Sequence, residues 1–395
     1  MTAELGQLVK SVRKRRALTQ QELADLSGVS LARIRQLETG GHQGVRLATL
    51  RKLAIALQVR TSVLQPGGST DAEHASAATL DLWEPVRRAL VAPRVEGEHP
   101  DEPVCTSAAD LEAPMRTLAA LEEACRYAEV AALLPSALVD AAALGDEGRG
   151  VRARLLRFTA WTLVQNRQFD TAALTVDRAL DIADDPEIVV GAVQALVWSH
   201  LRQGNLDAAR QLAEHWADEI EPKRFSRATP KELARWGKVY MHLANVAVRD
   251  NSPGAADDAL SVARAAAARV GREIFFERLP VRTFGPVSVA HIAVETAVVT
   301  DQPTRALAIA ESLPSAVPSG GSASRLRHRL DVANAHAQLR QWPEAMGTLA
   351  ELRTAAPEWL TQQRYARDIV QTVVSERRTL TPDMRELADF VNLEY

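Results

Sequence analysis

The chain has two cysteines among its 395 residues, only 5% aromatic residues and no long apolar run. Cys105 and Cys125 are too few for the disulfide framework of a small secreted protein, which favours a cytoplasmic setting. No apolar run reaches the ~20 residues of a membrane-spanning helix, and the start MTAELGQLVK does not have the pattern of a signal peptide. We therefore expect a cytoplasmic protein with no membrane partner.

The motifs of common enzyme and metal sites are also missing. The nine histidines are scattered, and none falls in HExxH or beside a paired CxxC pattern, so we expect no metal site. The patterns GxGxxG, GxxxxGK and GxSxG are absent, which predicts no cofactor and no enzyme. An isolated acid–base pair such as Asp331 with His291 is left open.

Abundant alanine and leucine, with almost no β-branched alternation, predict an all-α protein. The net charge of −3 conceals two regions of opposite sign. Residues 1–66, the head, carry 11 Lys and Arg against 4 Asp and Glu, whereas the remainder carries 36 against 46. A basic head joined to an acidic remainder indicates a polyanionic partner for the head alone.

Apolar spacing in the head predicts four short helices and a fifth at Thr61–Leu64. Thr19 and Glu22 form a capping box that begins the second helix. Gly28 supplies a left-handed turn after that helix, and Ser30 caps the third helix, which runs from residue 31 to 38.

The stretch LTQQELADLSGVSLARIRQLETGG, followed by LATLRKLAIALQV, resembles the XRE (phage-repressor) class of helix-turn-helix domains along its whole length. The resemblance implies a double-stranded DNA operator as partner, with the third helix in the major groove. The residues that it places at the base edges are Ser30, Leu31, Ala32, Arg35 and Gln36. Gln20 and Arg33 match positions near phosphate or the first base pairs. We add four basic residues as phosphate contacts: Lys14, Arg15, Arg16 and Arg46.

Two of these positions have a defined hydrogen-bonding role. Arg35 can bridge guanine O6 and N7, and Gln36 can bind adenine or support Arg35. Leu31 and Ala32 are apolar where many relatives are polar, so they either pack on thymine methyl groups or fill space. For each single arginine, a solvated surface charge is the alternative interpretation.

Residues 67–114 differ in composition from the regions on either side. Pro66-Gly67-Gly68-Ser69 predicts a flexible hinge. One amphipathic helix over residues 80–90 and an acidic loop containing Pro93, Pro100 and Pro103 follow, so we expect a linker.

Residues 115–395, the body, repeat one pattern: a helix, a tight turn, an alanine and a second helix. The anchoring alanines lie 37, 47, 50 and 39 residues apart and are Ala172, Ala209, Ala256, Ala306 and Ala345. The units resemble tetratricopeptide repeats, which predicts an α-solenoid of helical hairpins, with a sixth, degenerate unit over 111–148. Longer spacings predict insertions at Glu221–Thr229 and Glu273–Pro286.

In such repeats the first helix of each pair lines the concave face. Alignment on the alanines, together with the face following Gly285-Pro286, predicts a groove site made of Arg157, Trp161, Gln194, Trp198, Met241, Asn245, Ser288, His291, Glu295 and Asn334. For Trp161 and Trp198 a purely structural role is the alternative, and for His291 it is the favoured one. Side-chain amides suit a peptide backbone.

This layout is architecturally similar to the RRNPP peptide-pheromone receptors and to actinobacterial regulators of the same plan. It implies a sequence-specific transcription regulator whose body dimerises and binds a signal peptide or small molecule that alters operator binding. The alternative is a regulator whose repeats serve only as a protein–protein interaction scaffold, with no small ligand.

Overall fold

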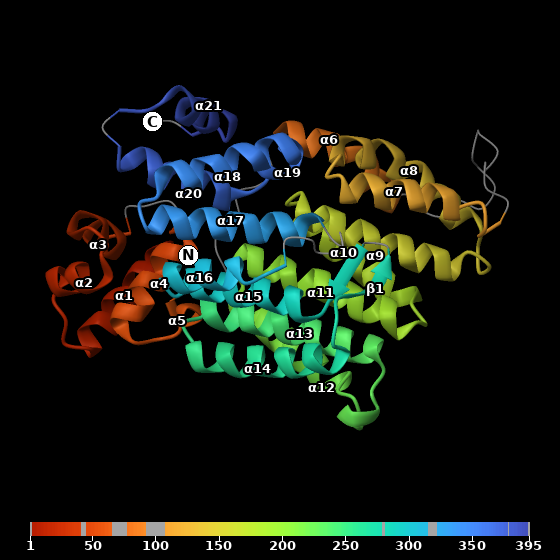
Figure 1. Ribbon diagram of the computed structural model, residues 1–395, viewed down its shortest axis with the longest axis horizontal. Coiled ribbons are helices and arrows are strands. Elements are labelled where there is room, and N and C mark those ends of the chain that lie inside the picture. The colour runs from red at the N-terminus through yellow and green to blue at the C-terminus, as the bar shows by residue number, and fades with distance from the viewer. Residues whose placement is uncertain are drawn as a thin grey trace.

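The computed structural model describes residues 2–40, 45–64, 77–91, 107–278, 281–314, 322–377 and 379–393. Within these ranges the fold is all-α: a small N-terminal helical bundle adjoins a curved array of helical hairpins (Figure 1). The predicted fold class, a helix-turn-helix head followed by an α-solenoid, is confirmed. None of the helices in the described ranges is both long and apolar enough to cross a bilayer.

The head contains the five predicted helices. They are α1 (Thr2–Arg15), α2 (Gln20–Ser27), α3 (Leu31–Glu38), α4 (Leu47–Leu57) and α5 (Thr61–Leu64). The capping box forms, because Thr19 Oγ1 accepts from the Glu22 amide at 3.1 Å while the Thr19 amide donates to Glu22 Oε2 at 2.7 Å. Gly28 has φ 65°, and Ser30 Oγ accepts from the Arg33 amide at 3.3 Å. These caps fix the angle between α2 and α3.

The rest of the chain is built from longer helices. They are α6 (Ala77–Val91), α7 (Glu112–Glu123), α8 (Tyr127–Ala143), α9 (Arg149–Gln165), α10 (Phe169–Ile182), α11 (Pro186–Gln203), α12 (Leu206–Glu219), α13 (Pro230–Arg249), α14 (Pro253–Val270), α15 (Pro286–Val299), α16 (Pro303–Glu311), α17 (Ser322–Gln338), α18 (Trp342–Ala355), α19 (Pro357–Thr361), α20 (Arg364–Ser375) and α21 (Pro382–Phe390).

One type of turn joins the helices of each predicted hairpin. A residue with positive φ ends the first helix, at Arg167, Gly204, Asn251, Asp301 and Arg340. The next amide donates back to a carbonyl five residues earlier, as in Gln168 to Leu163 at 2.9 Å, which is a Schellman turn. The anchoring alanine follows five residues after the positive φ and is at most 1% exposed in all five hairpins. A small residue there lets the two helices approach closely.

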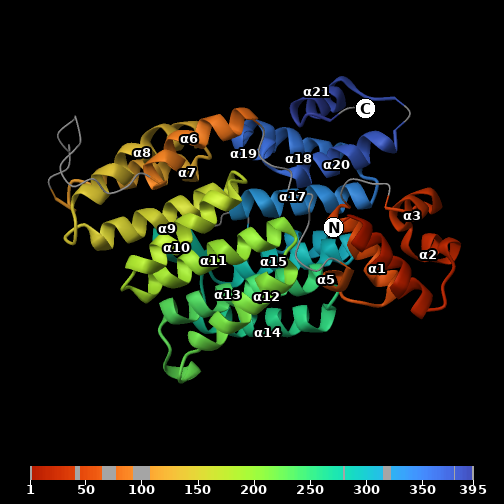
Figure 2. The ribbon, with the colours of Figure 1, turned by 180° about the vertical axis from the view of Figure 1, so that it is seen from behind.

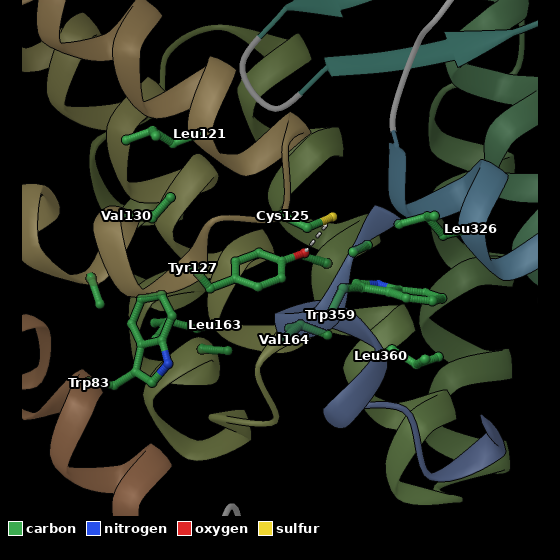
Figure 3. Close-up of a cluster of buried hydrophobic side chains, with 14 of the residues drawn as sticks. Trp83, Leu121, Cys125, Tyr127, Val130, Leu163, Val164, Leu326, Trp359 and Leu360 are labelled. Atoms are coloured by element: carbon green, nitrogen blue, oxygen red, sulfur yellow. Dashed lines mark hydrogen bonds between the residues drawn. The ribbon is translucent and has the colours of Figure 1, made fainter. Parts of the chain in front are cut away.

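The helix predicted for the linker does not stand apart from the body. Trp83, Val86 and Leu90 on α6 are at most 2% exposed and belong to the main core of the body. Figure 3 shows Trp83 near Tyr127 of α8, whose hydroxyl lies 3.9 Å from Cys125 Sγ. The hinge at residues 66–69 and the acidic loop, including Cys105, fall outside the described residues.

The array of hairpins curves until its two ends meet. The Ala128 amide at the start of α8 donates to Glu358 on α19 at 2.8 Å, and Arg202 donates to the Gln362 carbonyl at 3.3 Å. Trp359 lies on the side of Tyr127 opposite Trp83 (Figure 3), and all three side chains are at most 2% exposed. Figures 1 and 2 show α19 beside α6 from both sides. The concave face is therefore closed at one end rather than open.

Both predicted insertions carry local structure. A single 3-10 turn, Phe225–Arg227, lies in the first. The second holds an antiparallel hairpin of β1 (Ile274–Arg278) and β2 (Val281–Phe284), which the sequence did not predict. Phe284 is fully buried against Gly237 of α13, where a side chain would collide with its ring. This contact holds the hairpin over the N-terminal half of α13.

Candidate functional site

The third helix of the head presents a polar edge to solvent. Ser30, Ala32, Arg35 and Gln36 are exposed, while Ile34 is buried in the head core. Leu31 and Arg33 are half-buried, and Arg33 donates to Gln36 Oε1 at 3.0 Å. Both α2 and α3 lie on the side of the head away from α13 in the two opposite views (Figures 1 and 2).

A buried ion pair anchors the end of α3. Arg13 Nε and Nη2 donate to the two oxygens of Glu38 at 2.6 and 2.8 Å, and Gln20 Nε2 donates to Glu38 Oε2 at 2.8 Å. Although burial raises it, the hydrogen bonds from Arg13 and Gln20 bring the pKa of Glu38 below its ordinary value. Gln20, a predicted DNA contact, therefore also helps to position α3.

The other predicted phosphate contacts differ in their surroundings. Lys14 and Arg15 are exposed at the end of α1. Arg16 donates to the carbonyls of Leu57 and Gln58 at 3.1 and 3.0 Å, so its guanidinium group is tied to the end of α4. Arg46 Nη1 donates at 2.9 Å to Asp368 on α20, so it links the head to the body.

The body contains a partly open cavity of about 330 Å³. Its walls come mainly from the first helices of the hairpins, α9, α11, α13, α15 and α17. Seven of the ten predicted groove residues line it: Trp161, Trp198, Met241, Asn245, Ser288, His291 and Glu295. The alignment on the anchoring alanines thus brought together most of one surface.

The other three predicted groove residues lie outside this lining. Gln194 accepts a hydrogen bond from Arg282 of β2, which covers that turn of α11. Arg157 is buried one turn before Trp161. Asn334 Nδ2 donates to the Tyr365 hydroxyl at 2.9 Å, while Asp331, one turn earlier on α17, lines the cavity instead.

A buried cluster of charges forms one end of the cavity. Glu295 is ion-paired with Arg249, and Arg327 Nη2 lies 3.7 Å from the same Oε1. Burial raises the pKa of Glu295, but the charges of Arg249 and Arg327 outweigh it and hold the carboxylate ionised. Burial and the charge of Glu295 raise the pKa of Asp331 to about 8, so Asp331 is mostly protonated at neutral pH.

Three neutral histidines line another part of the wall. The rings of His291 and His328 stack with centroids 4.1 Å apart and an interplanar angle of 15°. Burial lowers the pKa of His291 to about 3 and that of His328 to about 4. Burial, with the charges of Lys238 and Arg282, lowers the pKa of His242 to about 3. Each imidazole therefore offers one donor and one acceptor.

Guanidinium groups already cover the aromatic walls. Arg282 lies 4.5 Å from the ring centroid of Trp161. Arg327 lies 5.8 Å from the ring centroid of Trp198 and 4.8 Å from that of Tyr365. These stacked pairs fix the tryptophan rings and place positive charge beside the cavity.

Sequence reasoning missed several lining residues. On α13 it selected Met241 and Asn245. Lys238 lies three residues before Met241, His242 lies three residues before Asn245, and both also line the cavity. Helical spacing of three, four and seven residues could have found both. Arg327 and His328 were missed because the alignment placed α17 one turn too far along.

Residues 9–64 match the helix-turn-helix family. The head is a helix-turn-helix domain. No curated protein and no solved structure matches the chain. The described residues contain no cluster of three or more His, Cys, Asp or Glu side chains arranged to hold a metal ion. The matched domain supports DNA binding and regulation as the role of the head.

The end of α13 holds the helix-turn-helix domain against the body. Arg51 Nε donates to the Val248 carbonyl at 3.2 Å, and Thr61 Oγ1 donates to the Arg249 carbonyl at 2.9 Å. The Ser62 amide donates to Asp250 Oδ1 at 2.8 Å. In return, Asn251 Nδ2 donates at 3.0 Å to the Val59 carbonyl, just before α5. These contacts fall within four consecutive residues of the body.

Proposed function

We propose that the protein is a transcription regulator whose helix-turn-helix domain binds an operator and whose body binds a small-molecule effector in the cavity. The observation that supports this most directly is the dual role of α13. Lys238, Met241, His242 and Asn245 line the cavity, and residues 248–251 at the end of the same helix hold the DNA-binding domain. An effector that shifts α13 would therefore also move the head.

The charge cluster provides the link between the two sites. The Arg249 side chain pairs with Glu295 in the cavity wall, while its main-chain carbonyl accepts from Thr61 of the head. At the start of α4, Arg46 binds Asp368 on α20, the helix that also carries Tyr365. An effector acts only if it binds one head position better than another, and both contacts can change when the cluster rearranges.

The small volume of the cavity favours a small molecule over an extended peptide. Ring closure by α8 and α19 shortens the groove, and about 330 Å³ lies in the range of small-molecule sites. The same small volume weighs against the cavity as a scaffold site, because a protein partner needs a broad accessible face.

The remaining predictions belong to this proposal as well. The contacts proposed for DNA are those predicted from the sequence: Lys14, Arg15, Arg16, Gln20, Ser30, Leu31, Ala32, Arg33, Arg35, Gln36 and Arg46. We propose the divisions at residues 66 and 114, with α6 of the intervening segment packed into the core of the body. We also propose a tetratricopeptide-like body similar in plan to the RRNPP receptors, and a homodimer with operator half-sites about 34 Å apart.

Native mass spectrometry of the intact protein from its own host tests the proposal. We expect a dimer that carries a retained small molecule, and loss of that molecule in Asn245→Ala with His242→Ala. His215→Ala, an exposed change on α12, is the matched control. A wild-type protein whose operator affinity is the same before and after denaturing extraction of small molecules and refolding would contradict an effector.

A further inference from the structure

We propose that the cavity takes a small oxyanion, such as a carboxylate, attached to an apolar body. The proposal rests on the proposed function, because it names the chemical class of the effector for the same cavity. It follows from which polar groups of the lining are already engaged and from the sign of the charges around them.

Among the described residues, three carboxyl groups line the cavity, and the protein engages all three. Glu295 accepts from Arg249 and Asn245, and Asp331 is bonded to Tyr365. Glu273 accepts from the amide and the hydroxyl of Ser288, both at 2.8 Å. A ligand cation would have to compete with these internal donors for every carboxylate.

Hydrogen-bond donors, by contrast, remain unused. Among the described residues, Trp198 Nε1 and Arg327 Nε are buried with no hydrogen-bond partner. The nitrogens His242 Nε2 and His328 Nδ1 are in the same condition and can donate. Asn245 Oδ1 is a buried acceptor without a partner. A ligand that satisfies this set brings at least two acceptors and one donor, since buried polar groups left unpaired are costly.

The local charge has the sign that an anion needs. Lys238, Arg325 and Arg327 line the cavity, and Arg249 lies behind Glu295. Among the described residues, the lining carboxyl groups opposed to them are those of Glu273 and Glu295, since Asp331 is mostly protonated at neutral pH. The excess among these described residues is positive, and charge-assisted hydrogen bonds to an anion are stronger than neutral ones.

The aromatic walls fit an apolar body and disfavour a cation. Arg282 and Arg327 already lie over the Trp161 and Trp198 rings, so those faces do not form an open cage for a ligand cation. Met241, Val287 and Ile292 line the remaining wall and can contact a hydrocarbon part.

Three probes with one apolar body and different charge test the proposal: 2-naphthoate, 2-naphthamide and 2-naphthylmethylammonium. Isothermal titration calorimetry with the full-length protein measures each affinity at pH 7. We expect the carboxylate to bind about tenfold more tightly than the amide, as one charge-assisted hydrogen bond predicts, and the ammonium to bind weakest.

Variants then locate the anion. Lys238→Met and Arg327→Met should each remove most of the preference for the carboxylate. Lys231→Met removes the same charge from the surface of α13, where Lys231 pairs with Glu187, and should leave the preference unchanged. If Arg327→Met does not fold, Lys238→Met and the three probes with the wild-type protein still show whether the cavity prefers an anion.

The outcomes separate this inference from the proposed function. If the amide or the ammonium binds as tightly as the carboxylate, the ligand class is wrong while the cavity remains a binding site. If none of the three binds, and the retained molecule expected from native mass spectrometry is also absent, both proposals fail.

Discussion

The guanidinium group of Arg249 donates a hydrogen bond to Glu295, which joins the helix that carries the head to the wall of the cavity. The side chain of Arg249 is only 13% exposed and that of Glu295 only 4%. A buried pair of this kind is sensitive to the loss of either partner, because the remaining charge has no water to solvate it. The pair therefore joins the two parts of the structure, and we expect it to be sensitive to an effector bound in the cavity.

Glu295→Gln should destabilise the fold by about 3 kcal/mol, since it leaves Arg249 and Arg327 without their shared counter-ion. Urea unfolding of the intact protein measures this. The matched control is Glu351→Gln, which breaks a pair with Arg329 in which the carboxylate is 70% exposed. We expect that change to cost less than about 1 kcal/mol. Equal losses in the two variants would refute the special role of the buried pair.

Asp250→Ala should loosen the head without unfolding the body, because Asp250 Oδ1 accepts the Ser62 amide at 2.8 Å. Hydrogen exchange should speed up at residues 59–64 and stay unchanged in α9 and α10. Asp250→Asn keeps an acceptor and should retain most of the protection. Asp257→Ala, on the exposed side of α14, is the control. Unchanged exchange at residues 59–64 in Asp250→Ala would show that this contact does not hold the head.

Arg35→Ala should weaken operator binding by about 1–3 kcal/mol and relax specificity at one base pair. Arg15→Ala should weaken binding to all sequences alike, and it should reduce the slope of log affinity against log salt concentration by about one. Fluorescence anisotropy with an operator selected from a random DNA pool distinguishes the two. If Arg35→Ala binds the operator with wild-type affinity, α3 does not read the bases of the major groove through Arg35.

The sequence predicted the hairpins because their turns follow a local rule. A left-handed residue, a backward hydrogen bond and a small residue five positions on are all encoded within a few neighbours. The same applies to Thr19, Gly28 and Ser30 in the head. The β-hairpin was missed because its two strands are short and are held by a distant contact between Phe284 and Gly237.

Gly237→Ala tests that distant contact. A methyl group at this position would collide with the Phe284 ring, so we expect a loss of about 1–3 kcal/mol in the free energy of unfolding. Phe284→Leu in the same background should restore part of it. At Gly347, in the middle of α18, a methyl group would meet nothing within 4 Å, so Gly347→Ala should be neutral or stabilising. Equal effects of the two alanines would argue against packing at Gly237.

The pH dependence of stability should report the buried histidines. Burial, with His328 and Lys238 nearby, lowers the pKa of His291 to about 3, against an ordinary value of about 6.5. Between these two values the unfolded chain binds a proton that the folded chain does not, so stability falls as the pH falls. Relative to His291→Asn, the wild type should lose about 1.4 kcal/mol per pH unit below pH 6.

Chemical unfolding of both proteins between pH 7 and pH 4.5 gives this difference, in which the contributions of groups that do not interact with His291 cancel; His328, stacked on His291, is part of what is measured. The control is His215→Asn, since His215 is exposed on α12. A difference between wild type and His291→Asn that stays constant with pH would mean that His291 is solvated in the folded protein.

The cavity could be predicted only in part. Alignment on the alanines identified Trp161, Trp198 and Asn245, because helical spacing transfers from one hairpin to the next. It failed at Asn334, which binds Tyr365 of α20. Contacts between elements far apart in the chain, such as Ala128 with Glu358, close the ring and have no local signature. The docking of Arg46 on Asp368 belongs to the same class.

Thermodynamic linkage between the cavity and the DNA-binding head is the most direct test of whether a bound effector changes operator affinity. Operator affinity of the intact protein is measured by anisotropy with and without saturating 2-naphthoate, and 2-naphthoate affinity is measured with and without operator. We predict that both affinities change by the same factor, about fivefold or more, and that Arg249→Met removes the change. Operator affinity that is identical with and without bound 2-naphthoate would contradict the proposed coupling between the cavity and the head.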